Sequence, residues 1–355
     1  MTDNHRIKNI YYMLSYAYQA LREKGYEKVA SEVFDNIHNL FAAILIFGVK
    51  SQIKRGLYRD YVPKEERLSG LRGQVKITDT IKKHIRPQGK LLCAFDEFTE
   101  NSPHNQVLKS VMFLLLRHGN VKTDNKKNLR NLLIYFNNVS DILPSDIRWN
   151  MLKYHRNNAS YRMLIEICNL TVDGLLLTTE TGEHRLSSWL SEEKMHNLYE
   201  RFVLAYFKRH YPELDPRAAY IDWDITIGNK SKYLPIMKSD ILLTKNNKTI
   251  IIDAKYYCET MHTYHESKTY ISSHLYQIYT YVMNYRRMIS GSVSGILLYA
   301  KTDEEITPDE DMIISGNKIS VLTLDLNTSF FDISRQLSSI ADEFSTCTID
   351  KVFLK

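Results

Sequence analysis

Two aspartates on either side of a short polar turn constrain this chain more than any other feature of its sequence. Asp240 and Asp253 are thirteen positions apart, and Asp253 follows the apolar run 249–252 and opens the tripeptide Asp253-Ala254-Lys255. The apolar, β-branched segments 239–244 and 249–253 flank the polar segment 245–248. This pattern predicts two antiparallel strands joined by a turn.

The predicted hairpin brings three charged groups together. If Thr244 pairs with Thr249, the same register sets Asp240 opposite Asp253, because the two pairs of residue numbers have the same sum. Directly opposed residues have Cβ atoms about 4.5 to 5.5 Å apart. Lys255 lies two residues beyond Asp253, so the period of two along a strand points it to the same face. Two carboxylates and an amine are therefore expected to converge.

A divalent cation would relieve the repulsion between two carboxylates at this separation. Magnesium prefers oxygen ligands, and we expect Asp240, Asp253 and the carbonyl of Ala254 to supply them. Such a site suits phosphodiester hydrolysis, in which the metal polarises the phosphoryl oxygen and lowers the pKa of a bound water, while Lys255 orients the nucleophile or stabilises the transition state. The alternative is an ordinary turn aspartate followed by a lysine. Charges on so apolar a strand are costly without a partner, which favours the metal site.

At these residues the chain resembles the PD-(D/E)xK nuclease superfamily. It is also similar to the McrC family, the nuclease subunits of McrBC methylation-dependent restriction systems. The similarity extends over nearly the whole chain, through 7–17 (IKNIYYMLSYA), 55–57 (RGL), 70–73 (GLRG), 95–101 (FDEFTEN), 223–224 (WD) and the hairpin with Tyr256 and Tyr257. The order of these segments, rather than any one of them, carries the resemblance.

The resemblance implies a division of labour between two proteins. An McrB-like AAA+ GTPase hexamer recognises and translocates double-stranded DNA, while the McrC-like subunit docks on that ring, stimulates GTP hydrolysis and cuts. The sequence agrees on one point: it has no Gly-x-x-x-x-Gly-Lys-Ser/Thr loop, since of its 13 Gly only Gly89 precedes a Lys, and no Ser or Thr follows. GTP is therefore expected on the partner. A double-strand break needs two cuts, so a second copy of the chain is expected in the active complex.

Three further residues are candidate members of the catalytic site. Gln277 and Tyr281 are four positions apart and share one face of a predicted helix. The resemblance to RecB-like nucleases, some of which carry a Gln-x-x-x-Tyr pair here, implies that they contact the scissile phosphate or the lysine; the alternative is helix packing. Glu200 stands where the superfamily often has an acid near the metal, although it could equally be a solvated helix residue.

The expected fold class is α/β (α+β overall), in two domains. Residues 1–165 are expected to form a mainly helical partner-binding domain with a small β-rich element at 58–98, and residues 166–355 a PD-(D/E)xK endonuclease domain, a mixed central sheet flanked by helices. Periodicity predicts helices at 7–22, 33–53, 105–117, 128–136, 161–177, 195–210 and 270–288, a polar turn at 178–185, and further strands at 220–227, 294–299 and 319–324. We expect the tyrosines of the first helix to pack in a core.

Charge is unevenly distributed along the chain. Residues 50–90 hold twelve Lys or Arg against four acids, whereas residues 303–350 hold eleven acids against two bases. The basic segment favours a polyanion such as DNA or an acidic face of a partner, with a solvated surface as the alternative.

Other sequence signals exclude several classes of protein. No run approaches about 18 apolar residues, and residues 1–6 contain no apolar signal-peptide core, so we expect a cytoplasmic protein with no membrane association. The four Cys are far apart and form no CxxC pair, and His262, His265 and His274 match no zinc motif and lie in a segment predicted as a loop that enters a helix.

The leading hypothesis from the sequence is a type IV-like restriction endonuclease subunit, a magnesium-dependent phosphodiester hydrolase driven by a GTPase. Two alternatives stay open. One is an autonomous RecB-like repair or processing nuclease with the same site. The other is a non-catalytic scaffold that activates an NTPase ring.

Overall fold

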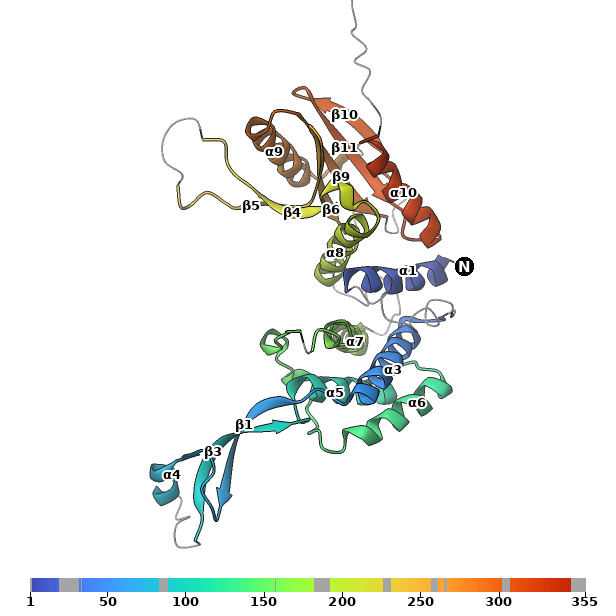
Figure 1. Cartoon of the computed structure of the whole chain (residues 1–355). Coiled ribbons are helices and arrows are strands. Elements are labelled where there is room, and N and C mark those ends of the chain that lie inside the picture. The colour runs from blue at the N-terminus through green and yellow to red at the C-terminus, as the bar shows by residue number, and fades with distance from the viewer. Residues whose placement is uncertain are drawn as a thin grey trace, which may run out of the picture. The chain divides into compact units, whose positions relative to one another are not determined.

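The chain forms two compact units. The computed structural model describes residues 2–18, 32, 34–82, 89–156, 158–181, 192–225, 231–256, 261–264, 267–301 and 307–345. One unit is Asn36–Gly182, here called the helical unit, and the other, the sheet unit, joins Met1–Asp35 to Glu183–Lys355 (Figure 1).

This division differs from the expected domains 1–165 and 166–355 at two places. The first helix, α1 (Thr2–Ala17), packs against α8 (Glu192–His210), so it belongs to the sheet unit. Helix α7 (Tyr161–Thr181) packs against α3 and α5 and belongs to the helical unit, and it continues into the first residues of the predicted polar turn. Long-range packing of apolar faces, rather than order along the chain, sets the boundary.

The sheet unit contains a six-stranded sheet in the order β10-β11-β9-β6-β5-β4, and the prediction of a mixed sheet is confirmed. Strands β6, β9 and β11 are parallel neighbours, and the other pairs are antiparallel. The strands are β4 (Arg217–Ile221), β5 (Met237–Lys245), β6 (Lys248–Lys255), β9 (Ser292–Ala300), β10 (Glu310–Ile314) and β11 (Asn317–Leu324).

Strands β5 and β6 form the predicted hairpin in the predicted register. Thr244 pairs with Thr249, and the ladder continues to Ile241 and Ile252. The turn places Asn246 at φ 54°, a left-handed conformation that Asn tolerates better than most residues. Asp240 and Asp253 are therefore the next residues of the two strands beyond the last pair, at the end of β6 where its neighbour is β9.

Helix α9 (Ser272–Met288) covers the face of the sheet that carries Asp253 and Lys255. A Cβ atom at Gly295 of β9 would lie 2.7 Å from Ile278 Cγ1 and 2.8 Å from Val282 Cγ2, so the glycine allows the helix to pack closely. Gly295 is level with Ile251 of β6, and Ile251, Asp253 and Lys255 alternate onto the same face. Helices α8 and α10 (Phe330–Asp342) lie on the other side (Figure 1).

The tyrosines of α1 pack in the core, as expected. Tyr11 is 1% exposed, the Tyr12 ring stacks on Phe330 at 4.2 Å between centroids, and Tyr16 Oη lies 2.8 Å from His210 Nε2. These contacts join α1 to α10 and to α8. Residues 19–22 of the predicted first helix lie outside the described residues.

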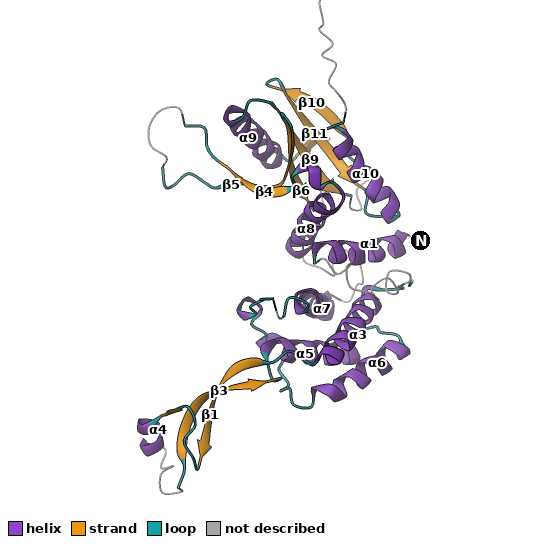
Figure 2. Ribbon diagram, in the orientation of Figure 1, coloured by secondary structure: helices purple, strands orange, loops and turns teal. Residues whose placement is uncertain are grey.

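The helical unit consists of α3 (Ile37–Arg55), α5 (Pro103–His118), α6 (Thr123–Leu133) and α7 around a shared core (Figure 2). The predicted start signal of α5 is confirmed, because Ser102 Oγ accepts a hydrogen bond from Asn105 N–H at 3.4 Å and Pro103 occupies the first turn. Short 3₁₀ turns follow at Ile134–Phe136, Pro144–Asp146 and Trp149–Met151.

A narrow β-sheet extends from these helices, in agreement with the small β-rich element predicted at residues 58–98 (Figure 1). It consists of β1 (Asp60–Leu68), β3 (Leu91–Thr99) and β2 (Gln74–Val75), with helix α4 (Ile77–Lys82) close to its far end. We call residues 60–99 the arm. Acids neutralise part of its positive charge, since Lys64 pairs with Glu66 and Glu97, and Lys76 pairs with Glu65.

The structure corrects several details of the predicted elements. The segment predicted as a loop around His262 and His265 contains the two-stranded sheet of β7 (Met261–Tyr264) and β8 (Ser267–Tyr270), although His265 itself lies outside the described residues. Strand β4 ends at Ile221 instead of reaching residue 227, and residues 226–227 are also outside. Among the described helices none is long and apolar enough to cross a membrane.

Candidate functional site

The two aspartates and the lysine of the hairpin come together at the end of β6. Asp253 is 1% exposed and Lys255 6% exposed, and Lys255 Nζ lies 2.8 Å from Asp253 Oδ2. Asp240 Oδ2 accepts a hydrogen bond from the backbone N–H of Ala254 at 2.9 Å, which fixes its carboxylate beside the tripeptide. The structure thus brings together the three groups that the predicted register combines.

The two carboxylates share a poorly hydrated site, which disfavours the charged form of both. Burial, then the charges of Asp253 and Glu200, raise the pKa of Asp240 to about 8, against smaller opposing effects of the Ala254 N–H and Lys255. Burial also raises the pKa of Asp253, while Lys255 and a hydrogen bond with Asp240 oppose that rise. In the absence of a cation, the pair therefore retains a proton near neutral pH.

Lys255 is also held from the helix that covers this face. Its Nζ donates a hydrogen bond to Gln277 Oε1 at 3.1 Å, and Gln277 Nε2 donates to Tyr281 Oη at 3.0 Å. Gln277 and Tyr281 are one turn apart on α9, and Tyr281 is 7% exposed. Of the alternatives posed for this pair, the structure shows Gln277 in contact with the lysine and Tyr281 packed in the core as the partner of Gln277.

Glu200 approaches the site from α8. Its charge raises the pKa of both aspartates, as noted for Asp240. Its Oε1 lies 2.7 Å from His196 Nε2, and His196 Nδ1 accepts a hydrogen bond from the backbone N–H of Tyr256 at 3.3 Å. Sequence reasoning missed His196. The available signal was its position four residues before Glu200, on the same face of a helix.

The chemistry of the donors fits a hard divalent cation. Apart from Lys255 and Asp240, no donor among the described residues reaches either oxygen of the buried Asp253 carboxylate. Buried carboxylate oxygens with so few donors are costly unless a cation neutralises them. Within the described ranges no three His, Cys, Asp or Glu side chains converge as a complete ligand set. The aspartate oxygens would therefore be the few protein ligands of a magnesium ion, in a site of the kind that water and substrate complete.

His274 lies near this group without joining a metal cluster. Its Nδ1 is 2.9 Å from Tyr299 Oη, and Tyr299 pairs with Lys255 in the ladder between β6 and β9. The side chain of His262 lies outside the described part of the structure.

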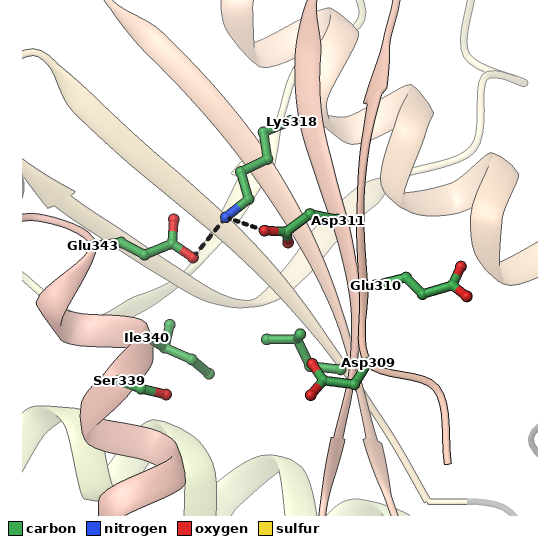
Figure 3. A pocket seen from close by; sticks show the side chains of 8 residues that line it. Asp309, Glu310, Asp311, Lys318, Ser339, Ile340 and Glu343 are labelled. Carbon is green, nitrogen blue, oxygen red and sulfur yellow. Dashed lines mark hydrogen bonds and ion pairs between the residues drawn. The ribbon is translucent and has the colours of Figure 1, made fainter. Parts of the chain in front are cut away.

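A polar pocket of about 260 Å³, separate from the aspartate pair, lies between β10, β11 and α10 (Figure 3). Three consecutive acids, Asp309 to Asp311, line it together with Glu343, and Lys318 Nζ pairs with Asp311 at 3.0 Å and with Glu343 at 3.1 Å. This cluster accounts for part of the acidic C-terminal segment, and its ion pairs need no ligand.

The comparisons with known proteins agree over most of the chain. Residues 2–300 match the model of the family described as McrBC 5-methylcytosine restriction system component. The chain is 26% identical over 341 residues to the Type IV methyl-directed restriction enzyme EcoKMcrBC of Escherichia coli strain K12, covering 95% of this chain and 97% of that protein.

Two solved structures are also similar to the chain. One is a half-complex from a tetradecameric assembly of Thermococcus gammatolerans McrB AAA+ hexamers with bound McrC, at TM-score 0.48 and 17% identity, covering 95% of this chain and 76% of that chain. The other is the Thermococcus gammatolerans McrBC complex, at TM-score 0.39 and 20% identity, covering 58% of this chain and 59% of that chain.

Proposed function

Because this chain belongs to the McrBC 5-methylcytosine restriction system component family, we propose that it is the DNA-cutting subunit of a GTP-driven restriction complex. The observation that carries this proposal is the pair of the half-buried Asp240 and the buried Asp253, with Lys255 at 2.8 Å from Asp253. A mixed sheet that presents this motif at the end of a hairpin is the arrangement expected of a PD-(D/E)xK nuclease. The cofactor in this proposal is Mg²⁺, held by Asp240, Asp253 and the carbonyl of Ala254.

The residues of the site have separate tasks in phosphodiester hydrolysis. A bound Mg²⁺ would polarise the phosphoryl oxygen and lower the pKa of a water molecule. Lys255 supplies a positive charge whose position is fixed, because its ammonium group contacts both Asp253 and Gln277. A charge fixed in this way stabilises the extra negative charge of the transition state without reorganisation. Tyr281 keeps Gln277 in place through its own hydrogen bond.

We propose that Mg²⁺ binding releases close to one proton at pH 7. Asp240, with its pKa raised to about 8, is mostly protonated there and must lose its proton to ligate the cation. Mg²⁺ affinity should therefore rise with pH up to about 8 and change little above it. Titration calorimetry of the full chain in buffers of different ionisation enthalpy measures the released proton; an affinity independent of pH between 6 and 8 would contradict the assignment.

The proposed partner is an AAA+ GTPase ring. The solved Thermococcus gammatolerans assembly consists of McrB AAA+ hexamers with bound McrC, and this sequence has no nucleotide-binding loop of the P-loop type. We propose that the arm carries the docking surface for that ring. Tyr61 and Phe98 are cross-strand partners with ring centroids 5.0 Å apart, and they are 67% and 56% exposed. Exposed aromatic pairs of this kind are common anchors of protein interfaces.

Replacing both Tyr61 and Phe98 with Ala should weaken binding to the GTPase partner by about 30-fold or more, because each exposed anchor contributes on the order of 1 to 2 kcal/mol. Surface plasmon resonance with the purified AAA+ GTPase partner measures the affinity. Tyr135→Ala is the matched control, since Tyr135 is 60% exposed in the same unit but outside the arm. Equal affinity of the double variant and the wild type would remove the arm from the interface.

The experiment that tests the proposed function compares plasmid cleavage by the chain alone and with the GTPase and GTP, on methylated and unmethylated DNA. Cutting only with the partner and GTP is the expected result, and it also reports whether methylation is required. Efficient cutting by the chain alone would favour the autonomous nuclease. Stimulated GTP hydrolysis with no cutting on either DNA would favour the scaffold.

A further inference from the structure

One histidine, His196 of α8, contacts both a carboxylate on its own helix and the backbone directly after β6. His196 and Glu200 are one turn apart on α8, and their side chains are 22% and 29% exposed. The distance of 2.7 Å between His196 Nε2 and Glu200 Oε1 is that of a strong, charge-assisted hydrogen bond.

The hydrogen bond to Nδ1 determines which tautomer of the His196 ring faces Glu200. His196 Nδ1 accepts a hydrogen bond from the backbone N–H of Tyr256, so in the neutral imidazole the proton resides on Nε2 and points at Glu200. Tyr256 directly follows Lys255. The imidazole therefore connects Glu200 to the backbone at the end of β6, the strand that carries Asp253 and Lys255.

Glu200 acts electrostatically on the two aspartates, yet it is not part of their group. Its charge affects both Asp240 and Asp253. Among the described residues, however, these three carboxylates do not converge closely enough to form a ligand set. A glutamate side chain has several rotatable bonds and is expensive to hold in one rotamer, so its position here depends on a partner such as His196.

We propose that His196 is a positioning residue of the metal site, which holds the Glu200 carboxylate beside Asp240 and Asp253 so that its charge strengthens the attraction for a divalent cation. The inference rests on the proposed metal-dependent cleavage and adds one new member and one new function to that site. It resembles the general arrangement in which groups outside the ligand set orient those that face a metal, and loss of such a group typically lowers metal affinity about 10- to 100-fold.

Two substitutions separate the two hydrogen bonds of the imidazole. His196→Gln places an N–H donor close to the position of Nε2 and can keep the bond to Glu200. His196→Asn places an acceptor close to the position of Nδ1 and can keep the bond from Tyr256, but it is too short to reach Glu200. If His196 acts through Glu200, the Gln variant retains function and the Asn variant loses it.

The test is titration calorimetry of Mn²⁺ into the full chain without DNA. We expect His196→Asn and Glu200→Gln each to lower the affinity by about 10-fold or more, and His196→Gln to stay within about threefold of the wild type. The double variant His196→Asn with Glu200→Gln should bind no more weakly than Glu200→Gln alone, because the histidine acts only through the glutamate. His210→Gln, which removes another hydrogen-bonded histidine of α8, is the control and should bind like the wild type.

Asp253→Asn distinguishes failure of this inference from failure of the proposed function. If the wild type binds Mn²⁺ and Asp253→Asn does not, the site exists, and wild-type affinity in His196→Asn then overturns the role of His196. Additive losses in the double variant would also overturn it. If Mn²⁺ binding is absent or independent of Asp253, the metal site itself is wrong and this inference is overturned with it.

Discussion

The Asp240→Asn variant is expected to be more stable than the wild type without metal at pH 8 and to lose the stabilisation that Mg²⁺ gives the wild type. In the folded chain the pKa of Asp240 is raised to about 8 from its ordinary value near 3.8. Between these two values the folded state holds a proton that the unfolded state has lost, so the stability of the metal-free chain falls as pH rises from about 4 to about 8. Asparagine removes this contribution because it never ionises.

The size of the effect should be easy to measure. Removing the Asp240 carboxylate, whose charge is only partly compensated, should raise the free energy of unfolding by on the order of 1 to 3 kcal/mol at pH 8, and each kcal/mol shifts the midpoint by roughly 2 to 4 °C in a unit of this size. Differential scanning calorimetry at pH 5 and pH 8, with and without Mg²⁺, measures it. At pH 5 the difference between the variant and the wild type should be less than half of that at pH 8, because only a small part of the range between the unfolded and folded pKa values of Asp240 lies below pH 5.

Asp215→Asn is the matched control for this experiment. Asp215 is an exposed aspartate of the same unit at φ 45°, a backbone conformation that Asn also adopts, so the substitution removes one negative charge without strain. This control should keep the Mg²⁺-dependent stabilisation. A lower melting midpoint of Asp240→Asn than of the wild type at pH 8 would show that the aspartate pair is not a site of repulsion.

Lys255→Ala is expected to abolish DNA cleavage in the reconstituted complex while leaving partner binding and stimulation of GTP hydrolysis intact. Removal of a single preorganised group that stabilises the transition state typically lowers the rate about 10²- to 10³-fold. Lys255 is buried at the end of β6 in the sheet unit, whereas the proposed docking surface is on the arm of the helical unit. The two activities should therefore separate. Cleavage and GTP hydrolysis are measured in the same reaction.

The control for Lys255 is another lysine of the same hairpin. Lys245→Ala changes the residue before the turn, away from the aspartate pair, and should cut at the wild-type rate. Cleavage by Lys255→Ala within a few-fold of the wild type would exclude the lysine from catalysis. Loss of cleavage, partner binding and GTPase stimulation together would indicate misfolding, which the melting profile of the variant detects independently.

The sequence was most informative where local pattern decides structure. The hairpin register followed from the apolar strands, the polar turn and the period of two, so the convergence of Asp240, Asp253 and Lys255 on one face could be predicted from the sequence. The spacing of Gln277 and Tyr281 predicted a shared helix face in the same way. Which of the two meets the lysine depends on how α9 packs on the sheet, through Gly295 of a different strand.

The sequence was least informative where distant segments meet. Helix α1 packs on α8 across about half the chain, which moved the domain boundary away from its predicted place. Strand β10 was missed because Glu310 and Asp311 interrupt its apolar pattern at the edge of the sheet. The proposed role of His196 depends on its hydrogen bond with the Tyr256 N–H, and no spacing along the chain connects those two residues.

The most direct test of the central claim is Mg²⁺-dependent cleavage by the complex assembled with Asp253→Asn in place of the wild-type chain. Purified GTPase, GTP, Mg²⁺ and plasmid are combined with each form, and linear product and GTP hydrolysis are followed together. If this chain cuts DNA through the Asp240 and Asp253 pair, the variant complex hydrolyses GTP at the wild-type rate and yields no linear DNA. Wild-type cleavage by the Asp253→Asn complex would place the nuclease site elsewhere and contradict the account.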